Sequence, residues 1–151
     1  MQTLSNLPQI TASHLVKSVN LNHHGTLYAG QMAEWLVEVG FMTARAALQC
    51  DPRRLVCIRL HGMDFRKSVP SGETLVLEGR VVHVGRTSLS VHVQAHLVDH
   101  PPGEPFPTEG FVTFVHIEEG RATPHGLDVA PPEEGEARRL WQYILEERKR
   151  R

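Results

Sequence analysis

Two glutamates lie four residues apart in a segment that carries almost no other charge. Within residues 30–48 the ionisable side chains are Glu34, Glu38 and Arg45. Carboxylates at this spacing share one stripe of a helix, and a buried, unpaired carboxylate is so costly that such groups concentrate at functional sites. We expect at least one of the two to be functional. The alternative is a solvated stripe that pairs with Arg45 or with arginines of another subunit.

A polar turn, Asn22 to Gly25, comes shortly before this segment. A carboxamide can orient a water molecule or a carbonyl group through its hydrogen bonds, so Asn22 is a second candidate for chemistry. An asparagine followed by His-His-Gly is equally a routine turn residue, because its side chain bonds to the backbone two residues on. Both roles stay open for Asn22.

Other kinds of site find little support in the sequence. His92 and His96 share a face of one expected strand, but no cysteine or acid completes a tetrahedral metal set at ligand spacing. Cys57 has no neighbouring base that would activate its thiol. The chain has neither a G-x-S-x-G elbow nor a P-loop, which argues against a serine hydrolase of that type and against an NTPase. We expect no metal and no cofactor.

The two glutamates need a helix to position them, and residues 30–48 are suited to form it. The segment has no proline and many good helix formers, and apolar residues cover most of its circumference. We therefore expect a buried helix at the centre of the domain. After Asp51-Pro52 the apolar period changes from 3.6 to 2. The expected strands are residues 14–19, 55–61, 75–84, 88–98 and 111–117, and a second helix covers residues 136–148.

Alternation within the strands predicts which side chains face the core. In residues 55–61 the residues Val56, Ile58 and Leu60 face one way, and Arg59 and His61 face the other. In residues 88–98 the expected inward positions are Leu89, Val91, Val93, Ala95 and Leu97. One helix covered by an antiparallel sheet is an α+β, two-layer fold. Such a fold leaves one sheet face and one edge partly apolar, so oligomerisation is expected.

Composition limits the class of protein. The chain has 151 residues and a mass of 17.0 kDa, which predicts a single domain over residues 1–151. Its formal charge is −1, so it lacks the excess of basic residues that is typical of nucleic-acid-binding proteins. No apolar run is long enough to cross a membrane, and the first residues lack the features of a secretory signal. Two cysteines cannot cross-link a domain of this size, so we expect reduced thiols and a cytoplasmic protein.

The segment from Asn22 to Glu38, NHHGTLYAGQMAEWLVE, resembles the hotdog-fold acyl-CoA thioesterases. Their pattern is N-x-x-G-x-x-x-G-G followed by a central helix that carries an acid. The resemblance continues, in order, through residues 59–69 (RLHGMDFRKSV), 71–73 (SGE), 85–88 (GRTS) and 108–115 (TEGFVTFV). It covers roughly residues 12–125 and leaves a tail and helix at 131–151. It implies a hotdog fold, with an antiparallel sheet wrapped around one long helix.

The resemblance also implies a site shared between two subunits. In the family, the counterpart of Asn22 and a helix acid face each other across the dimer interface, and the acid acts on the thioester carbonyl. Backbone N–H groups near Gly25, Ala29 and Gly30 would receive the oxyanion. The position that matches the family acid is Val37, and Glu38 follows it, rotated by about 100° around the helix. We expect Glu38 to be the base or nucleophile and Glu34 to orient or support it.

Coenzyme A carries phosphates, so basic residues are expected at the rim of the site. The residues that match by motif are Arg59, Arg66, Lys67, Arg86, Thr87 and Ser88. The sequence thus predicts a homo-oligomeric acyl-CoA thioesterase that releases a free acid and CoA. The alternative is a non-catalytic hotdog module that binds an acyl ligand without turnover. Chain length, the choice between CoA and acyl carrier protein, and the size of the oligomer stay open.

Overall fold

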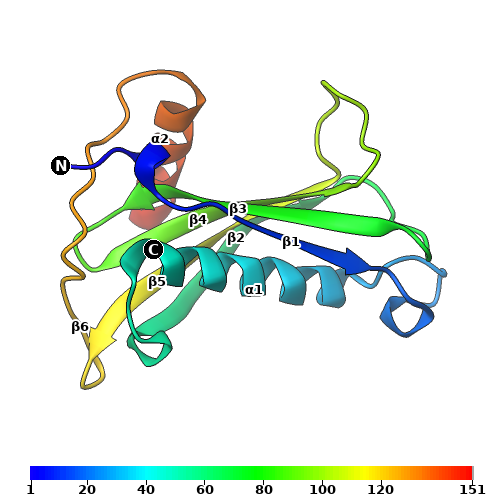
Figure 1. The fold of residues 1–151 in the computed structure, drawn as a ribbon, viewed down its shortest axis with the longest axis horizontal. Coiled ribbons are helices and arrows are strands. Elements are labelled where there is room, and N and C mark those ends of the chain that lie inside the picture. The colour runs from blue at the N-terminus through cyan, green and yellow to red at the C-terminus, as the bar shows by residue number, and fades with distance from the viewer. Residues whose placement is uncertain (151) are drawn as a thin grey trace.

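The proline-free segment after Tyr28 folds into one long helix, α1 (Ala29–Leu48), in the computed structural model, which describes residues 1–150. An antiparallel sheet curls around it, and α1 runs along one face of that sheet (Figure 1). The central position of α1 confirms the sequence prediction. The helix ends at Gln49, whose left-handed backbone allows its N–H to bond to the carbonyl of Arg45.

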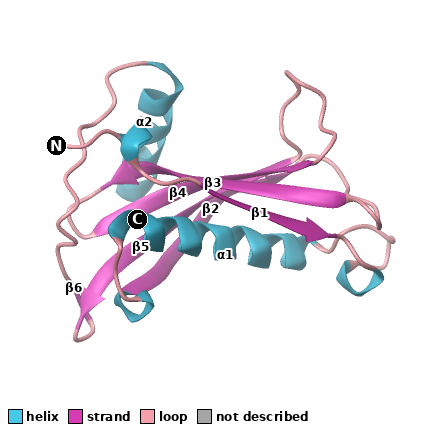
Figure 2. Cartoon of the chain, viewed as in Figure 1, coloured by secondary structure: helices cyan, strands magenta, loops and turns pink. Residues whose placement is uncertain are grey.

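The sheet contains the strands β1 (Ile10–Leu15), β2 (Leu55–Phe65), β3 (Thr74–Val84), β4 (Ser88–Leu97), β5 (Thr108–Glu118) and β6 (Arg121–Ala122). The spatial order is β1-β3-β4-β5-β2, every neighbouring pair is antiparallel, and the short β6 pairs with β5. Strands β1 and β2 therefore form the two edges (Figure 2). The second helix, α2 (Gly135–Lys149), packs on the face of the sheet opposite α1.

The core lies between α1 and the inner face of the sheet. On β4 the side chains of Leu89, Val91, Val93 and Ala95 are fully buried there, which confirms the predicted alternation. Helix and sheet approach closely because Gly79 of β3 has no side chain: a Cβ there would come within 2.4 Å of the Thr43 hydroxyl. A larger residue at that position would push α1 away from the sheet.

The first strand was predicted too late in the chain. The expected strand covered residues 14–19, but β1 ends at Leu15, and a 3-10 turn occupies Ser18–Asn20. The inward residues of β1 are Ile10, Ala12 and His14, while Leu15 and Val19, whose spacing suggested a buried face, are exposed. His14 stacks on Trp35 of α1, with ring centroids 4.2 Å apart.

The faces of β2 also differ from the prediction. Opposite residues of an antiparallel pair point to the same face, and Val56 lies opposite Val115 whereas Leu60 lies opposite Val112. Those two valines point to opposite faces of β5, so Val56 and Leu60 do as well. The cause is a bulge between Cys57 and Arg59, which adds one residue to β2. Sequence alternation cannot reveal such an insertion.

The outer face of the sheet is more buried than its polar residues suggest. Ser88, Ser90 and His92 point outward from β4, yet each is buried. Helix α2 covers this part of the sheet, packing Leu140, Trp141 and Ile144 against it. At the N-terminal end, Gln2 pairs in parallel with Val129, and this bridge ties the first residues to the segment that leads into α2.

Candidate active site

The turn before α1 is built by the side chain of Asn22. Its Oδ1 accepts hydrogen bonds from the backbone N–H of His24, at 2.8 Å, and of Thr26, at 3.3 Å. The backbone closes the same turn, since the N–H of Asn22 donates to the carbonyl of Thr26. Gly25, at φ 77°, already donates its N–H to the carbonyl of Asn22. The turn thus uses groups of both Asn22 and Gly25 to hold its own shape.

Helix α1 begins without a side-chain cap. Tyr28 is the N-cap residue and accepts no hydrogen bond through its side chain. Its ring lies over the first turn, close above Gly30, so a larger residue at that position would displace the exposed ring. Ala29 and Gly30 are exposed. The N–H groups of Ala29 and Gly30 and the positive end of the helix dipole are therefore free to meet an anion, whereas the N–H of Gln31 donates to the Tyr28 carbonyl.

A cleft of about 280 Å³ opens beside this helix start. The turn contributes Asn22 and Thr26, α1 contributes Ala29 and Met32, and the segment after β2 contributes Phe65–Val69. Thr108, the first residue of β5, completes the lining. The cleft therefore joins elements that are far apart in the sequence, and of the predicted site residues it unites Asn22, Ala29, Arg66 and Lys67.

The two basic residues of the cleft differ in how they are bound. The Arg66 guanidinium pairs with Glu109 at 2.9 Å and with Asp64 at 3.2 Å. Lys67 is exposed and makes no ion pair within residues 1–150. Burial opposes ionisation of Glu109, but hydrogen bonds from Arg66 and His92 outweigh it and lower the Glu109 pKa. A bound anion can therefore pair with Lys67 without disrupting an existing ion pair.

Neither glutamate of α1 reaches the cleft of its own chain. Met32 lines the cleft, and Glu34 lies about 200° further around the helix. Both Glu34 and Glu38 are exposed on this far face of α1. Glu34 accepts a hydrogen bond from Gln31 at 3.3 Å, whereas Glu38 has no hydrogen-bond partner within residues 1–150. A site that contains both Asn22 and a helix acid therefore needs a second copy of the chain.

The sequence analysis did not single out Asn20, which anchors this region. Its side chain is buried, accepts from the N–H of Lys17 at 2.9 Å and donates to Gln31 at 3.2 Å. A chain of hydrogen bonds thus leads from Asn20 through Gln31 to Glu34. The backbone carbonyl of Asn20 also accepts a hydrogen bond from the N–H of Tyr28. This contact forms only in the folded turn, so the sequence gives no signal for it.

The other residues assigned to CoA lie away from the cleft. Arg59 pairs with Glu147 of α2 at 2.9 Å and also donates to its carbonyl, so it attaches α2 to the sheet. A groove of about 700 Å³ on this face is lined by Arg59, Thr87, Ser88, Arg148 and Arg150, among others. Arg86 is exposed in the neighbouring β3–β4 turn. The basic end of α2, which was not among the predicted site residues, forms part of this groove.

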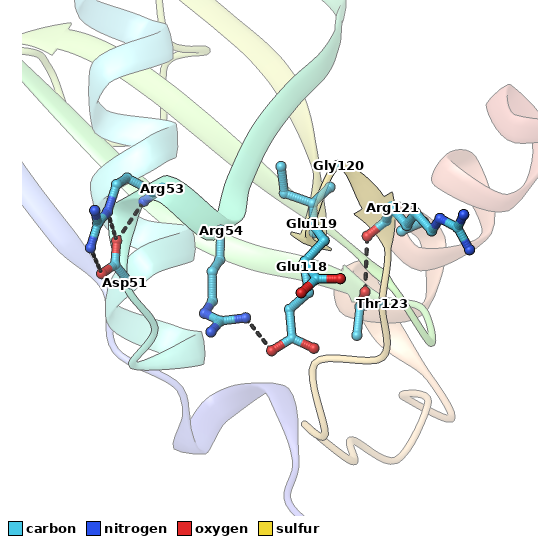
Figure 3. A pocket seen from close by; sticks show the side chains of 10 residues that line it. Asp51, Arg53, Arg54, Glu118, Glu119, Gly120, Arg121 and Thr123 are labelled. Carbon is cyan, nitrogen blue, oxygen red and sulfur yellow. Dashed lines mark hydrogen bonds and ion pairs between the residues drawn. The ribbon is translucent and has the colours of Figure 1, made fainter.

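The largest pocket is a different one. It measures about 780 Å³ and lies around the 3-10 turn at Pro52–Arg54 and the β5–β6 turn (Figure 3). Its charges largely satisfy each other, since Arg53 pairs with Asp51 and Arg54 pairs with Glu118. It contains none of the predicted site residues. We therefore place the candidate active site at the smaller cleft beside α1.

Within residues 1–150, no three side chains of His, Cys, Asp or Glu gather in a way that would hold a metal ion. No helix in the described part of the chain is long and apolar enough to span a membrane.

Comparisons with known proteins identify the family of the chain. A family model of the thioesterase superfamily matches residues 24–102. An uncharacterized acyl-CoA thioester hydrolase of Zymomonas mobilis is 33% identical over 104 residues, which are 68% of this chain and 67% of that protein. The acyl-CoA thioester hydrolase YciA of Escherichia coli is 27% identical over 137 residues, 85% of this chain and 99% of that protein.

Solved structures share the fold. A crystal structure of a hexameric acyl-CoA thioesterase without ligand superposes with a TM-score of 0.80 at 29% identity, over 99% of this chain and 94% of that one. An acyl-CoA hydrolase of Bacillus cereus gives a TM-score of 0.81 at 22% identity, over 100% and 90%. The long central helix, the curled antiparallel sheet and the matched family model lead to one conclusion: this chain belongs to the thioesterase superfamily and has the hotdog fold.

Proposed function

We propose that this protein hydrolyses acyl-CoA thioesters to a free carboxylic acid and CoA. The observation that carries the proposal is the cleft in which the uncapped start of α1 meets Asn22 and Lys67. This arrangement suits a thioester because the reaction develops a negative charge on the carbonyl oxygen. The names of the relatives in Zymomonas mobilis and Escherichia coli, both acyl-CoA thioester hydrolases, support the substrate class.

In this proposal water attacks the thioester carbonyl at the start of α1. The N–H groups of Ala29 and Gly30 receive the oxyanion, assisted by the helix dipole. Asn22 fixes the turn that shapes the cleft and positions water or the carbonyl. Glu38 removes the proton from this water, or, as a nucleophile, first forms an acyl anhydride that water then hydrolyses to the free acid. Glu34, held by Gln31, supports that role. The sulfur of CoA departs and is protonated as the free thiol.

The acid comes from a second subunit, because each chain directs its own glutamates away from its own cleft. The surface that a second copy would cover is already apolar. Leu60 of the edge strand β2 lies opposite Val112 and so points to the α1 side of the sheet, where it is 39% exposed. Met42 is exposed on the same side of α1 as Glu38. An unpaired edge strand with apolar side chains favours pairing with another chain. We propose a dimer, or a multiple of dimers, with the two α1 helices facing each other.

A further subunit contact, on the α2 face, would complete the CoA site. The Arg86 turn and the Arg59 groove lie at the far end of β4 and β5, since Ser88 pairs with Val115 and Ala95 with Thr108. That separation is roughly 23 Å for seven residues of strand, and the groove opens on the α2 face. Lys67 and Arg66 of the cleft can bind phosphate in the same chain. Arg86, Thr87 and Ser88 would reach the CoA of a neighbouring subunit.

The test is a thiol-release assay of the whole protein across a panel of acyl-CoA esters. We expect stoichiometric release of CoA and of the free acid, measured against a protein-only baseline because Cys57 is exposed. The rival function, an acyl-CoA binding module, is favoured by one observation: Val37 stands where the family pattern has its acid. Binding of acyl-CoA without any turnover would establish the rival and overturn the proposed hydrolysis.

A further inference from the structure

One buried hydroxyl in the cleft has no partner. Thr108 is 1% exposed, and its Oγ1 makes no hydrogen bond within residues 1–150. A buried donor that is left unsatisfied costs free energy, so folded proteins rarely retain one without a reason. The other fully or nearly fully buried threonines are satisfied: Thr43 donates to the Val39 carbonyl at 2.7 Å, and Thr113 bonds to Ser90 at 2.7 Å.

The position of Thr108 directs it toward the cleft. It pairs with Ala95 of β4, which points to the α1 side of the sheet, and opposite residues share a face. Two residues further along β5, a Cβ on Gly110 would lie 3.1 Å from Leu36 of α1. Thr108 therefore lies on the helix side, below the first turns of α1, and lines the cleft together with Asn22 and Met32.

Asn22 is less available than Thr108 for a ligand. Its Oδ1 accepts from two backbone N–H groups, and its Nδ2 donates to Thr26 at 3.2 Å. Thr108 has a free hydrogen, and a hydroxyl can donate and accept at once. A carbonyl oxygen that entered the cleft would satisfy it.

We propose that Thr108 is a substrate-positioning residue, whose buried hydroxyl donates a hydrogen bond to a carbonyl oxygen in the pantetheine arm of the bound thioester. This inference rests on the proposed function and extends it to a residue outside the N-x-x-G-x-x-x-G-G turn. The hydrogen bond is present in substrate and transition state alike. Its loss therefore raises KM and leaves kcat nearly unchanged.

Removal of the Thr108 hydroxyl should maintain or raise the stability of the fold but weaken substrate binding. Thr108→Val keeps the shape and the β-branch, which suits a strand, and removes an unsatisfied donor. The variant should melt at or above the temperature of the wild type. Its KM should rise about 10-fold, the size expected for one lost hydrogen bond of 1.4 kcal/mol. Thr108→Ser restores the hydroxyl and should recover the wild-type KM.

The experiment measures binding as well as turnover. The dissociation constant of a non-hydrolysable thioether analogue of acyl-CoA is measured by calorimetry for wild type, Thr108→Val and Thr108→Ser. KM is measured for acyl-CoA and for the matching acyl-pantetheine, and the loss should be equal for both because Thr108 binds their common arm. Thr43→Val makes the same chemical change at a buried threonine away from the cleft and should leave the affinity unchanged. Thr108→Ala repeats the measurement should the valine variant fold poorly.

The outcomes separate this inference from the proposed function. Weaker binding of the analogue by Thr108→Val, with rescue by Thr108→Ser and an undiminished melting temperature, supports the positioning role even if the wild type shows no turnover. Unchanged affinity in Thr108→Val and Thr108→Ala overturns it, however active the enzyme is. A drop in melting temperature that accompanies the weaker binding assigns Thr108 to packing and overturns it too.

Discussion

At the scale of single residues, the difference between Glu34 and Glu38 is one of hydrogen bonding. Both are exposed on one stripe of α1, but Glu34 is attached through Gln31 to the buried Asn20. Glu38 is unattached within residues 1–150 and so is the freer of the two to act on a substrate held by a second subunit. The proposed acid, Glu38, lies one position beyond Val37, which occupies the usual place in the family pattern, and is rotated from it by about 100° around the helix.

The first prediction assigns these roles by mutation. Glu38→Gln removes the base or nucleophile and should lower kcat at least about 100-fold. Glu34→Gln keeps a hydrogen-bonding group beside Gln31 and should lose much less. Both side chains are exposed, so melting temperature and oligomeric state should stay nearly unchanged in each variant. A dead Glu34→Gln beside an active Glu38→Gln would reverse the assignment.

The second prediction concerns the CoA phosphates. Arg86 is exposed in the β3–β4 turn and makes no ion pair within residues 1–150. Arg86→Glu should raise KM more than it lowers kcat, and the effect should be larger for acyl-CoA than for acyl-pantetheine, which lacks the nucleotide. Arg53→Glu, a charge reversal at a side chain that is 90% exposed in the other pocket, is the control. Equal losses on both substrates would make Arg86 a surface charge only.

At the scale of elements, the regular parts of the fold could be predicted and the irregular parts could not. Helices α1 and α2 and strands β3 and β4 show clean apolar periods, and the structure confirms each of them. The bulge in β2 and the early end of β1 follow from pairing with β5 and β3, which lie far away in the sequence. The cleft is equally non-local, so the sequence identified Asn22 but could not single out Asn20 or Thr108.

The third prediction tests how much α2 stabilises the sheet. Ile144 is fully buried between α2 and the outer face, beside Val82 and Phe111. Ile144→Ala leaves a cavity and should lower the free energy of unfolding by about 2–5 kcal/mol, measured by urea denaturation. Val98→Ala, at an exposed position just after β4, should change it by less than about 0.5 kcal/mol.

The fourth prediction uses a histidine under α2. His83 packs against Trp141, and burial, aided by the charge of Arg148, lowers its pKa to about 4. The unfolded chain, with a His83 pKa near 6.5, therefore binds the proton first as the pH falls. Stability is complete above about pH 6.5 and decreases toward pH 4, with a loss of about 2 kcal/mol at pH 5 from this group. His83→Phe keeps the aromatic contact and should flatten this part of the profile; an unaltered profile would contradict the assignment.

At the scale of the whole molecule, the proposed function depends on a second copy. The cleft holds the oxyanion groups and Lys67, while the candidate acids point away from it on the other side of α1. Leu60 of the β2 edge points to the α1 side of the sheet, because it lies opposite Val112, and it is partly exposed there. A single chain thus contains every proposed component of the site but cannot bring them together.

The fifth prediction is that assembly and activity are lost together. Leu60→Glu places a charge on the exposed β2 edge and should yield monomers at micromolar concentration by light scattering. Those monomers should retain the far-ultraviolet circular dichroism of the wild type and lack turnover. Asp99→Lys, a charge change in the β4–β5 connection, is the control and should remain oligomeric. An active monomer of Leu60→Glu would contradict both the assembly and the shared site.

The strand order has a consequence for how the protein is made. On the ribosome α1 and β2 emerge before β3, β4 and β5, yet Leu55 of β2 must wait for His116 of β5 before it can pair. The nascent chain therefore carries an unpaired strand with Val56, Ile58 and Leu60 exposed until residue 118 has left the exit tunnel. Non-local pairing of this kind is slow and open to aggregation. Stalled synthesis or truncation before β5 should leave an aggregation-prone fragment that depends on chaperones, because β5 is the strand with which β2 pairs.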